Sequence, residues 1–378
     1  MTVSGATEAA AVDRDLDLSP LFQPFACKSL QLANRIVMAP MTRAMSPGGV
    51  PGDDVAAYYR RRAENDVGLI VTEGTPVSEL GAPGTRMPLF CGNALNGWKR
   101  VVDEVHDAGG RIVPQLWHVG IERVADGDVF RPGEPSEAPS GLDRDGQPVA
   151  EPMTAGQIDG VVAAFADAAA HARELGFDGV EIHGAHGYLI DQFFRDVTNR
   201  RTDEYGGRLA ERTRFGARLV AAVRAAVGED FAIIFRMSQW RGGDYNAKLV
   251  RSPEELATFL RPLADAGVDI FHCSTRRYFL PEFEGADLNL AGWAQKLTGK
   301  PAITVGGVGI QGDFNSRDPV SSGSQTLAPL VERMQRGEFD LVAVGRALLT
   351  DPEWARKLHE GRLDELQGFQ REMLATLT

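Results

Sequence analysis

The chain is poor in cysteine and has no long hydrophobic run. Its three cysteines, Cys27, Cys91 and Cys273, are far apart and form no C-x-x-C pair, which argues against a disulfide framework, a structural zinc site or an iron–sulfur cluster. No apolar stretch reaches the roughly 18 residues of a membrane span, and the N-terminus lacks the basic start and apolar core of a secretory signal. These absences predict a cytoplasmic protein without a membrane partner.

Positive charge is in the minority. The 378 residues include 40 Lys and Arg against 52 Asp and Glu, a formal net charge of −12, and a field of this sign repels nucleic acid. The chain is 43% hydrophobic and 24% charged, which is typical of a globular protein with a sizeable core. We expect residues 1–18, which are small and acidic, to form a disordered tail and residues 19–378 to form one folded domain.

Short apolar runs, typical of buried parallel strands, alternate with longer amphipathic patterns. The predicted strands are 35–41, 68–73, 111–116, 179–183, 232–237, 270–274, 302–305 and 341–344. The predicted helices include 94–108, 155–175, 208–227, 253–266, 327–336 and 352–357. Eight βα units favour an α/β fold of the closed (β/α)8 TIM-barrel type over an open doubly wound sheet, whose G-x-G-x-x-G fingerprint is absent.

Three segments lie outside this repeat. Residues 22–32 are predicted to form an N-terminal hairpin that closes one end of the barrel. The proline-rich residues 118–152 follow the third strand and are expected to form a capping excursion over the barrel mouth. Residues 309–325 are expected to form a flexible loop.

The segment 179–188 reads as a strand that runs into a glycine-broken turn carrying His183, His186 and Tyr188. Residues three apart on a continuous strand face opposite sides, so both histidines enter one pocket only if the chain bends at Gly184. Two neutral histidines can donate to one oxygen while a nearby tyrosine protonates an adjacent carbon, which would polarise and protonate an activated alkene. The alternatives are two unrelated histidines or a metal site. No third metal ligand is obvious nearby, so no metal is expected.

In a parallel barrel the active site lies at the C-terminal strand ends, and motifs are found at these positions here. They are Met-Ala-Pro-Met-Thr-Arg (38–43), Thr-Glu-Gly (72–74), Gln-Leu-Trp (115–117), Glu-Ile-His-Gly-Ala-His-Gly-Tyr-Leu (181–189), Phe-Arg-Met-Ser (235–238) and Val-Gly-Arg (344–346). With N-x-R-x-D-x-Y-G-G at 199–207, they stand in the order found in the old yellow enzyme family. The chain resembles that family from about residue 21 to residue 358.

The resemblance implies an NAD(P)H-dependent flavin oxidoreductase with non-covalently bound FMN, and an FMN-binding domain spanning residues 19–378. Its members are ene-reductases that work by a ping-pong cycle, in which NADPH or NADH reduces FMN and leaves. A small-molecule α,β-unsaturated carbonyl or nitro compound then binds on the same face, with its oxygen held by His183 and His186. Hydride passes from flavin N5 to Cβ, and Tyr188 gives a proton to Cα.

The resemblance also implies the residues that contact the cofactor and the substrate. Arg236 would lie beside the N1/O2 edge of the flavin and raise its reduction potential, and Gln115 would meet the pyrimidine edge. The predicted cofactor-binding residues are Ala39, Pro40, Met41, Thr42, Gly74, Gln115, Arg236, Gly307, Gly345 and Arg346. The last three would hold the phosphate. Trp117, Tyr278 and Phe279 would line the substrate pocket.

Two other functions stay open at this point: a phosphate-binding barrel isomerase or lyase without redox chemistry, and a flavin binder without activity. The larger dienoyl reductases of the family, with an iron–sulfur centre and a second nucleotide domain, are not expected. The chain lacks a cysteine cluster and ends soon after the barrel. Both a monomer and a homodimer fit the sequence.

Overall fold

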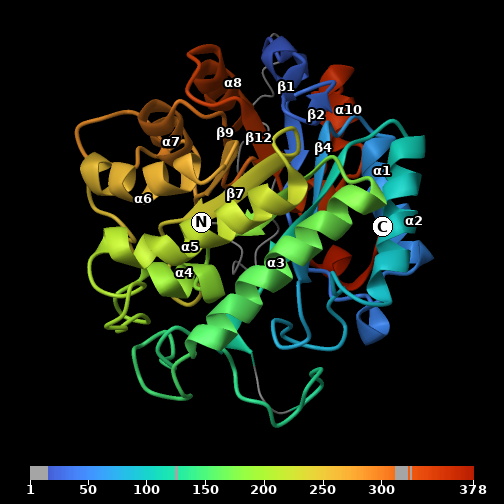
Figure 1. Ribbon diagram of the computed structural model, residues 1–378. Helices are drawn as coiled ribbons and strands as arrows, with labels where there is room; N and C mark the ends of the chain where they lie inside the picture. The colour runs from blue at the N-terminus through green and yellow to red at the C-terminus, as the bar shows by residue number, and fades with distance from the viewer. Residues whose placement is uncertain (1–15, 124–126, 311–321, 324–325) are drawn as a thin grey trace, which may run out of the picture.

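The computed structural model describes residues 16–123, 127–310, 322–323 and 326–378. Its central feature is a closed barrel of parallel strands in the order β12-β3-β4-β5-β6-β7-β8-β9 (Figure 1). The strands are β3 (Ile36–Met38), β4 (Leu69–Pro76), β5 (Ile112–Trp117), β6 (Gly179–His183), β7 (Ala232–Ser238), β8 (Ile270–Ser274), β9 (Ala302–Val305) and β12 (Leu341–Val344). All eight predicted strands are confirmed, with ends that shift by a few residues.

Helices surround the barrel and follow the predicted alternation. They are α1 (Asp53–Ala63), α2 (Ala94–Asp107), α3 (Ala155–Leu175), α4 (Leu189–Phe194), α5 (Leu209–Val227), α6 (Pro253–Asp265), α7 (Leu290–Thr298), α8 (Leu327–Gln335), α9 (Arg346–Thr350) and α10 (Trp354–His359). The predicted helices given above do not include α1, α4, α7 and α9. Helix α1 buries the charged Arg62 on its inner side, and α7 is only nine residues long with Gly292 inside it, so neither shows a clear apolar stripe.

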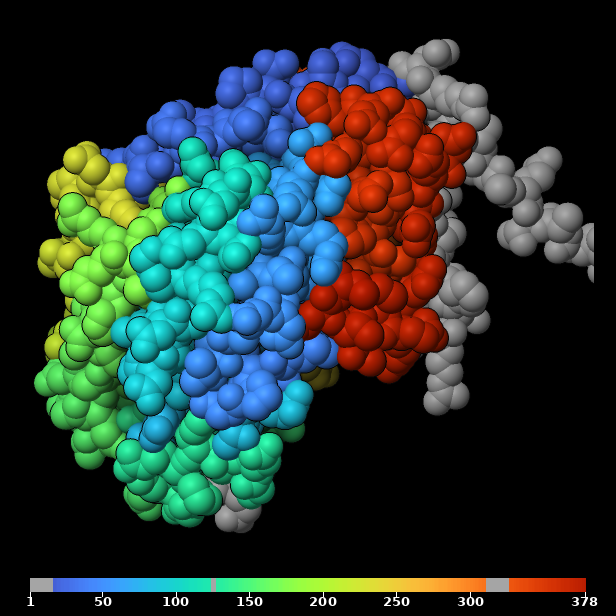
Figure 2. All heavy atoms as spheres, turned by 90° about the vertical axis from the view of Figure 1, so that its right-hand side faces the viewer, coloured from blue at the N-terminus to red at the C-terminus, as the bar shows by residue number. Residues whose placement is uncertain are grey.

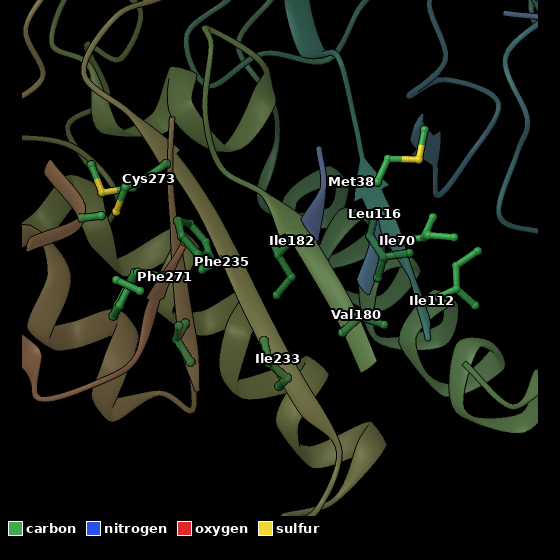
Figure 3. Close-up of a cluster of buried hydrophobic side chains, with 14 of the residues drawn as sticks. Met38, Ile70, Ile112, Leu116, Val180, Ile182, Ile233, Phe235, Phe271 and Cys273 are labelled. Atoms are coloured by element: carbon green, nitrogen blue, oxygen red, sulfur yellow. The ribbon is translucent and has the colours of Figure 1, made fainter. Parts of the chain in front are cut away.

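Side chains alternate between the inside of the barrel and the helices, as strand geometry requires. The outward-facing side chains pack with the helices into one core, and those labelled in Figure 3 include Ile70, Val180, Ile233 and Phe271. Inward-facing side chains in the lower part of the barrel form a second apolar cluster that includes Val37, Leu69, Val113, Ile234 and Ile303. Because the lower barrel is filled with apolar groups, the polar side chains inside the barrel lie in its middle and at the C-terminal strand ends.

The hairpin and the cap are both present. Strands β1 (Phe25–Cys27) and β2 (Leu30–Leu32) pair antiparallel, and Leu30 joins the inner apolar cluster, so the predicted hairpin closes this end of the barrel. In the cap, Gly120 N donates to His118 Nδ1 over 3.0 Å, and His118 Nε2, which therefore carries the proton, lies 2.9 Å from Glu137 Oε2. This buried pair fixes the described part of the predicted excursion to the end of β5.

The C-terminal segment packs against the N-terminal third of the chain, where Figure 2 shows the red and blue regions in contact. The Arg43 guanidinium donates to the carbonyls of Met373, Leu374 and Thr376 at 2.6–3.2 Å. The loop that follows β3 is therefore fixed by hydrogen bonds to the last residues of the chain.

Three predictions fall partly outside the described residues. Residues 1–15 of the predicted tail lie there, and of its described residues Leu18 is buried against the core. Residues 124–126 of the cap and 311–321 and 324–325 of the predicted loop also lie there, while β10 (Gly309–Ile310) pairs with β11 (Ser322–Gly323). No described helix has the length and apolar character needed to cross a membrane.

Candidate active site

The chain bends sharply after β6, as the two histidines require. Gly184 N donates to the carbonyl of Arg236 over 2.9 Å, and a Cβ on Gly184 would lie 2.2 Å from the Phe235 ring, so only glycine fits here. His186 then adopts a positive φ of 67°, which is uncommon outside glycine. The prediction of a bend at Gly184 is confirmed.

This bend brings the three predicted catalytic side chains together with Trp117 of β5. The rings of His183 and His186 lie 5.0 Å apart at 85°, and Tyr188 meets His183 edge-on at 5.3 Å. Trp117 contacts the Tyr188 ring at 4.9 Å and stacks on His183 at 6.2 Å. Four aromatic or imidazole groups thus form one cluster at the C-terminal ends of β5 and β6.

Burial sets the protonation of this cluster. Burial, with the positive charge of Arg236, holds the pKa of His183 and of His186 well below the ordinary histidine value. Burial raises the pKa of the Tyr188 hydroxyl. At neutral pH the site therefore contains two neutral imidazoles and a protonated phenol. Among the described residues, the buried His183 Nδ1 has no hydrogen-bond partner, so it is available to a ligand.

These neutral histidines make stability depend on pH. Above the unfolded-state pKa of about 6.5 neither state binds the proton. Below this pH each histidine binds a proton in the unfolded chain but not in the folded chain, so the free energy of unfolding decreases as pH falls. We expect the unfolding free energy to fall between pH 7.5 and pH 5.5, by at most about 1.4 kcal/mol per pH unit for each histidine.

The matched variant is His186→Asn, which keeps a neutral amide at this position. Urea unfolding measures the free energy of unfolding at pH 7.5 and pH 5.5. The decrease between these two pH values should be smaller by about 1 kcal/mol in the variant than in the wild type. Equal losses in the two proteins would show that His186 titrates alike in the folded and unfolded states.

Two further side chains touch this cluster that the sequence patterns did not identify. Trp240 stacks on His186 with ring centroids 4.2 Å apart, and Ser274 Oγ lies 2.9 Å from His186 Nε2. Ser274 ends β8 and Trp240 follows β7 by two residues, so their places at strand ends were the signal that was available.

A buried ion pair holds the turn itself. Asp191 Oδ2 accepts from Gly187 N at 2.6 Å and from Arg195 Nε at 2.7 Å. Arg195 also donates to the carbonyl of Gln239 over 3.0 Å, which ties the turn after β6 to the loop after β7. This pair, which sequence reasoning also missed, fixes the position of His186 relative to Trp240.

The predicted flavin-binding side chains lie beside the same cluster. Gln115 and Arg236 are buried on β5 and β7, and strand register places Arg236 beside His183. Arg236 Nε is buried and has no partner among the described residues, as expected of a donor reserved for a ligand. A permanent cation, an amide and this unsatisfied donor fit the pyrimidine edge of a flavin.

The other predicted cofactor contacts come from neighbouring strand ends. A Cβ on Gly345 would lie 3.6 Å from Met41 Sδ and 3.9 Å from Ala39 Cβ, so the ends of β12 and β3 are adjacent. Pro40 is half-buried and Thr42 exposed in the segment that follows β3, and Gly74 lies against Trp117, whose ring a Cβ would reach at 2.5 Å. Gly307 follows β9 with a φ of 76° and lies near Arg277, a cation that the sequence motifs did not identify. Arg346 begins α9 directly after Gly345.

Glu73 fixes the backbone of the segment that follows β3. Its carboxylate accepts from the backbone N–H groups of Arg43 and Ala44 at 2.7 and 2.9 Å, and burial raises its pKa to about 7. The Thr-Glu-Gly motif therefore has a structural member, Glu73, beside the predicted flavin contact at Gly74.

The two predicted pocket residues after β8 are placed differently. Tyr278 is fully buried and its hydroxyl donates to the carbonyl of Thr326, and its ring contacts Phe279 rather than the cluster of His183, His186 and Tyr188. Phe279 is 36% exposed and its ring meets that of Tyr278.

Within the described part of the chain, no group of three or more His, Cys, Asp or Glu side chains is placed so that it could hold a metal ion.

Comparisons with known proteins find similar chains and similar folds. The model of the NADH:flavin oxidoreductase / NADH oxidase family matches residues 20–365. 12-oxophytodienoate reductase 7 of Oryza sativa subsp. japonica is 34% identical over 355 residues, which cover 89% of this chain and 86% of the relative.

Solved structures are similar as well. The old yellow enzyme homologue from Zymomonas mobilis has a TM-score of 0.77 and 28% identity, covering 95% of this chain and 97% of its own. Morphinone reductase in complex with tetrahydroNAD has a TM-score of 0.75 and 27% identity, and the match covers 94% of this chain and 93% of the reductase chain.

Proposed function

This chain belongs to the NADH:flavin oxidoreductase / NADH oxidase family, that of the old yellow enzymes, and on this premise we propose that it is an ene-reductase. Its cofactor is FMN and its hydride donor is a nicotinamide nucleotide. Family membership argues against the isomerase or lyase alternative, which has no redox step. We further propose that residues 19–378 act as one FMN-binding domain and that the substrates are α,β-unsaturated carbonyl or nitro compounds.

One observation carries this proposal: the buried His183 and the half-buried His186 and Tyr188 form a single cluster beside Gln115 and Arg236. Both histidines are neutral and Tyr188 is protonated, so the cluster offers N–H donors for an oxygen and a proton for a carbon. A relative named for oxophytodienoate and a structural neighbour named for morphinone, both carbonyl compounds, support a substrate with a carbonyl oxygen.

In the proposed reaction the protein binds, orients and protonates the alkene. When bound, FMN supplies the hydride to Cβ after reduction by NAD(P)H. The two imidazole N–H groups face the substrate oxygen and stabilise the charge that develops there, an effect that burial strengthens. Tyr188 holds the proton destined for Cα, and Trp117 and Trp240 flank the cluster and limit the access of water.

The test is turnover by the purified protein. We expect a yellow protein whose visible absorption bleaches with NADPH or NADH and returns on addition of 2-cyclohexenone, with one cyclohexanone formed per nicotinamide oxidised. Yellow protein that bleaches but forms no saturated product from enones or nitroalkenes would contradict the proposal and favour a flavin binder without this activity.

The proposed phosphate contact gives a separate prediction. Replacing Arg346 by alanine should weaken FMN binding by roughly 10–100-fold, because hydrogen bonds to a charged group contribute about 1.5–3 kcal/mol. Binding to the flavin-free protein is measured by quenching of flavin fluorescence.

Riboflavin, which lacks the phosphate, is the control ligand, and Arg214→Ala on the exposed side of α5 is the control variant. Arg346→Ala should bind riboflavin as the wild type does. If it loses affinity for riboflavin and FMN equally, Arg346 does not contact the phosphate.

A further inference from the structure

A carboxylate that the proposed mechanism does not use lies beneath the cluster. Glu181 is two residues before His183 on β6 and is fully buried inside the barrel. Its Oε1 accepts from Gln115 Nε2 over 2.7 Å, and its Oε2 lies 2.6 Å from His272 Nδ1 on β8. Strand register pairs Gln115 with Glu181 and Arg236 with His272, so the four side chains form one polar layer between the apolar lower barrel and the strand ends.

This layer holds a definite charge. Burial alone would raise the pKa of Glu181, but the contact with His272 and the charge of Arg236 outweigh it and the pKa is lowered. Burial lowers the pKa of His272 against the opposing effect of Glu181, and because an ionised carboxylate only accepts hydrogen bonds, the Nδ1–H of His272 donates to Glu181. The layer thus contains one carboxylate and one guanidinium. Burying these two charges costs free energy of desolvation, which indicates that they serve a function.

The carboxylate also fixes the direction of the Gln115 amide. An ionised carboxylate only accepts hydrogen bonds, so the group that faces Glu181 must be the amide NH₂. The amide oxygen of Gln115 is then turned away from Glu181 and is left as an acceptor. The pyrimidine edge of a flavin carries an N–H donor between two carbonyl oxygens, which this acceptor matches.

We propose that Glu181 is a positioning residue that sets the reduction potential of the flavin: it presents the Gln115 oxygen to the pyrimidine edge and partly offsets the Arg236 charge. His272 assists by supplying the N–H that keeps Glu181 ionised and oriented. This inference rests on the proposed placement of the flavin over Gln115 and Arg236.

The test is the midpoint potential of FMN in Glu181→Gln, measured by equilibration with a dye of known potential. Reduced flavin carries negative charge beside Arg236, and without the carboxylate the full Arg236 charge stabilises it. We expect a more positive potential, with the reduction equilibrium shifted on the order of tenfold. Glu338→Gln is the matched control, because Glu338 is also buried and paired, with Arg333, but lies in no strand of the barrel.

His272→Asn and His272→Leu form a second pair of nearly equal size. Asparagine retains an N–H donor near the position of Nδ1 and should keep the wild-type potential, whereas leucine should shift it toward the Glu181→Gln value. If Glu181→Gln fails to fold or to hold FMN, the two His272 variants provide the test. Equal midpoint potentials in His272→Asn and His272→Leu overturn the inference, and a shifted potential in His272→Leu alone supports it.

An unchanged potential in flavin-loaded Glu181→Gln, or an equal shift in Glu338→Gln, would also overturn the inference. The proposed function is judged separately, by turnover of the wild-type protein. A wild type that reduces cyclohexenone while Glu181→Gln keeps its potential would refute only the role of Glu181.

Discussion

Replacing Tyr188 by phenylalanine is expected to slow the reduction of 2-cyclohexenone by about 10²–10⁴-fold, the usual cost of losing a general acid. The substitution removes one hydroxyl and almost no volume, so the contacts of the ring with Trp117 and His183 are kept. Reduction of the flavin by NAD(P)H should proceed near the wild-type rate, because that step needs no proton from Tyr188. Stopped-flow absorbance of the flavin measures the two half-reactions separately.

Nitroalkenes provide an internal control for this variant. Their hydride adduct is a stable nitronate that solvent can protonate later, so their reduction should be largely spared. Tyr205→Phe is the matched control variant, since Tyr205 is also buried but its hydroxyl accepts from Arg218 outside the cluster. Unchanged reoxidation by cyclohexenone in Tyr188→Phe would remove Tyr188 from the mechanism.

His183→Ala and His186→Ala should each reduce the rate of the enone half-reaction by about 10²–10³-fold, the cost of one oxyanion donor. Phenolates resemble the developing enolate, so both variants should also bind p-hydroxybenzaldehyde more weakly and lose its charge-transfer band. Flavin reduction by NAD(P)H should change much less. His171→Ala, on α3 away from the cluster, is the control.

His186→Asn distinguishes donation from packing. The amide retains a neutral donor but loses the stack of the imidazole on Trp240. We expect it to recover most of the activity lost in His186→Ala. Full affinity for p-hydroxybenzaldehyde in both alanine variants would mean that the histidines do not hold the substrate oxygen.

The barrel could be predicted because each strand is a local apolar run and the longer helices α2, α3, α5 and α6 are local amphipathic patterns. The bend at Gly184 could be predicted for the same reason, since strand geometry allows His183 and His186 to meet only if the chain turns there. The catalytic roles of these histidines and of Tyr188 stay predictions, although the structure brings the side chains together.

What the sequence did not predict depends on residues far apart in the chain. Glu181 and His272 are separated by 91 positions, and only the barrel register brings them into contact. Tyr278 was assigned to the pocket because it follows a strand, but in a loop the side-chain direction has no fixed period, and the hydroxyl turns to Thr326. Leu18 was assigned to the tail by its acidic neighbours, although its own side chain is buried.

A single-turnover experiment tests the central claim most directly. The protein is reduced anaerobically with one equivalent of NADPH or NADH and mixed with 2-cyclohexenone while flavin absorbance is recorded and the product is analysed. The account predicts that oxidised flavin returns and that one cyclohexanone forms per flavin, in the absence of oxygen. Flavin that stays reduced in the presence of enones and nitroalkenes would contradict it.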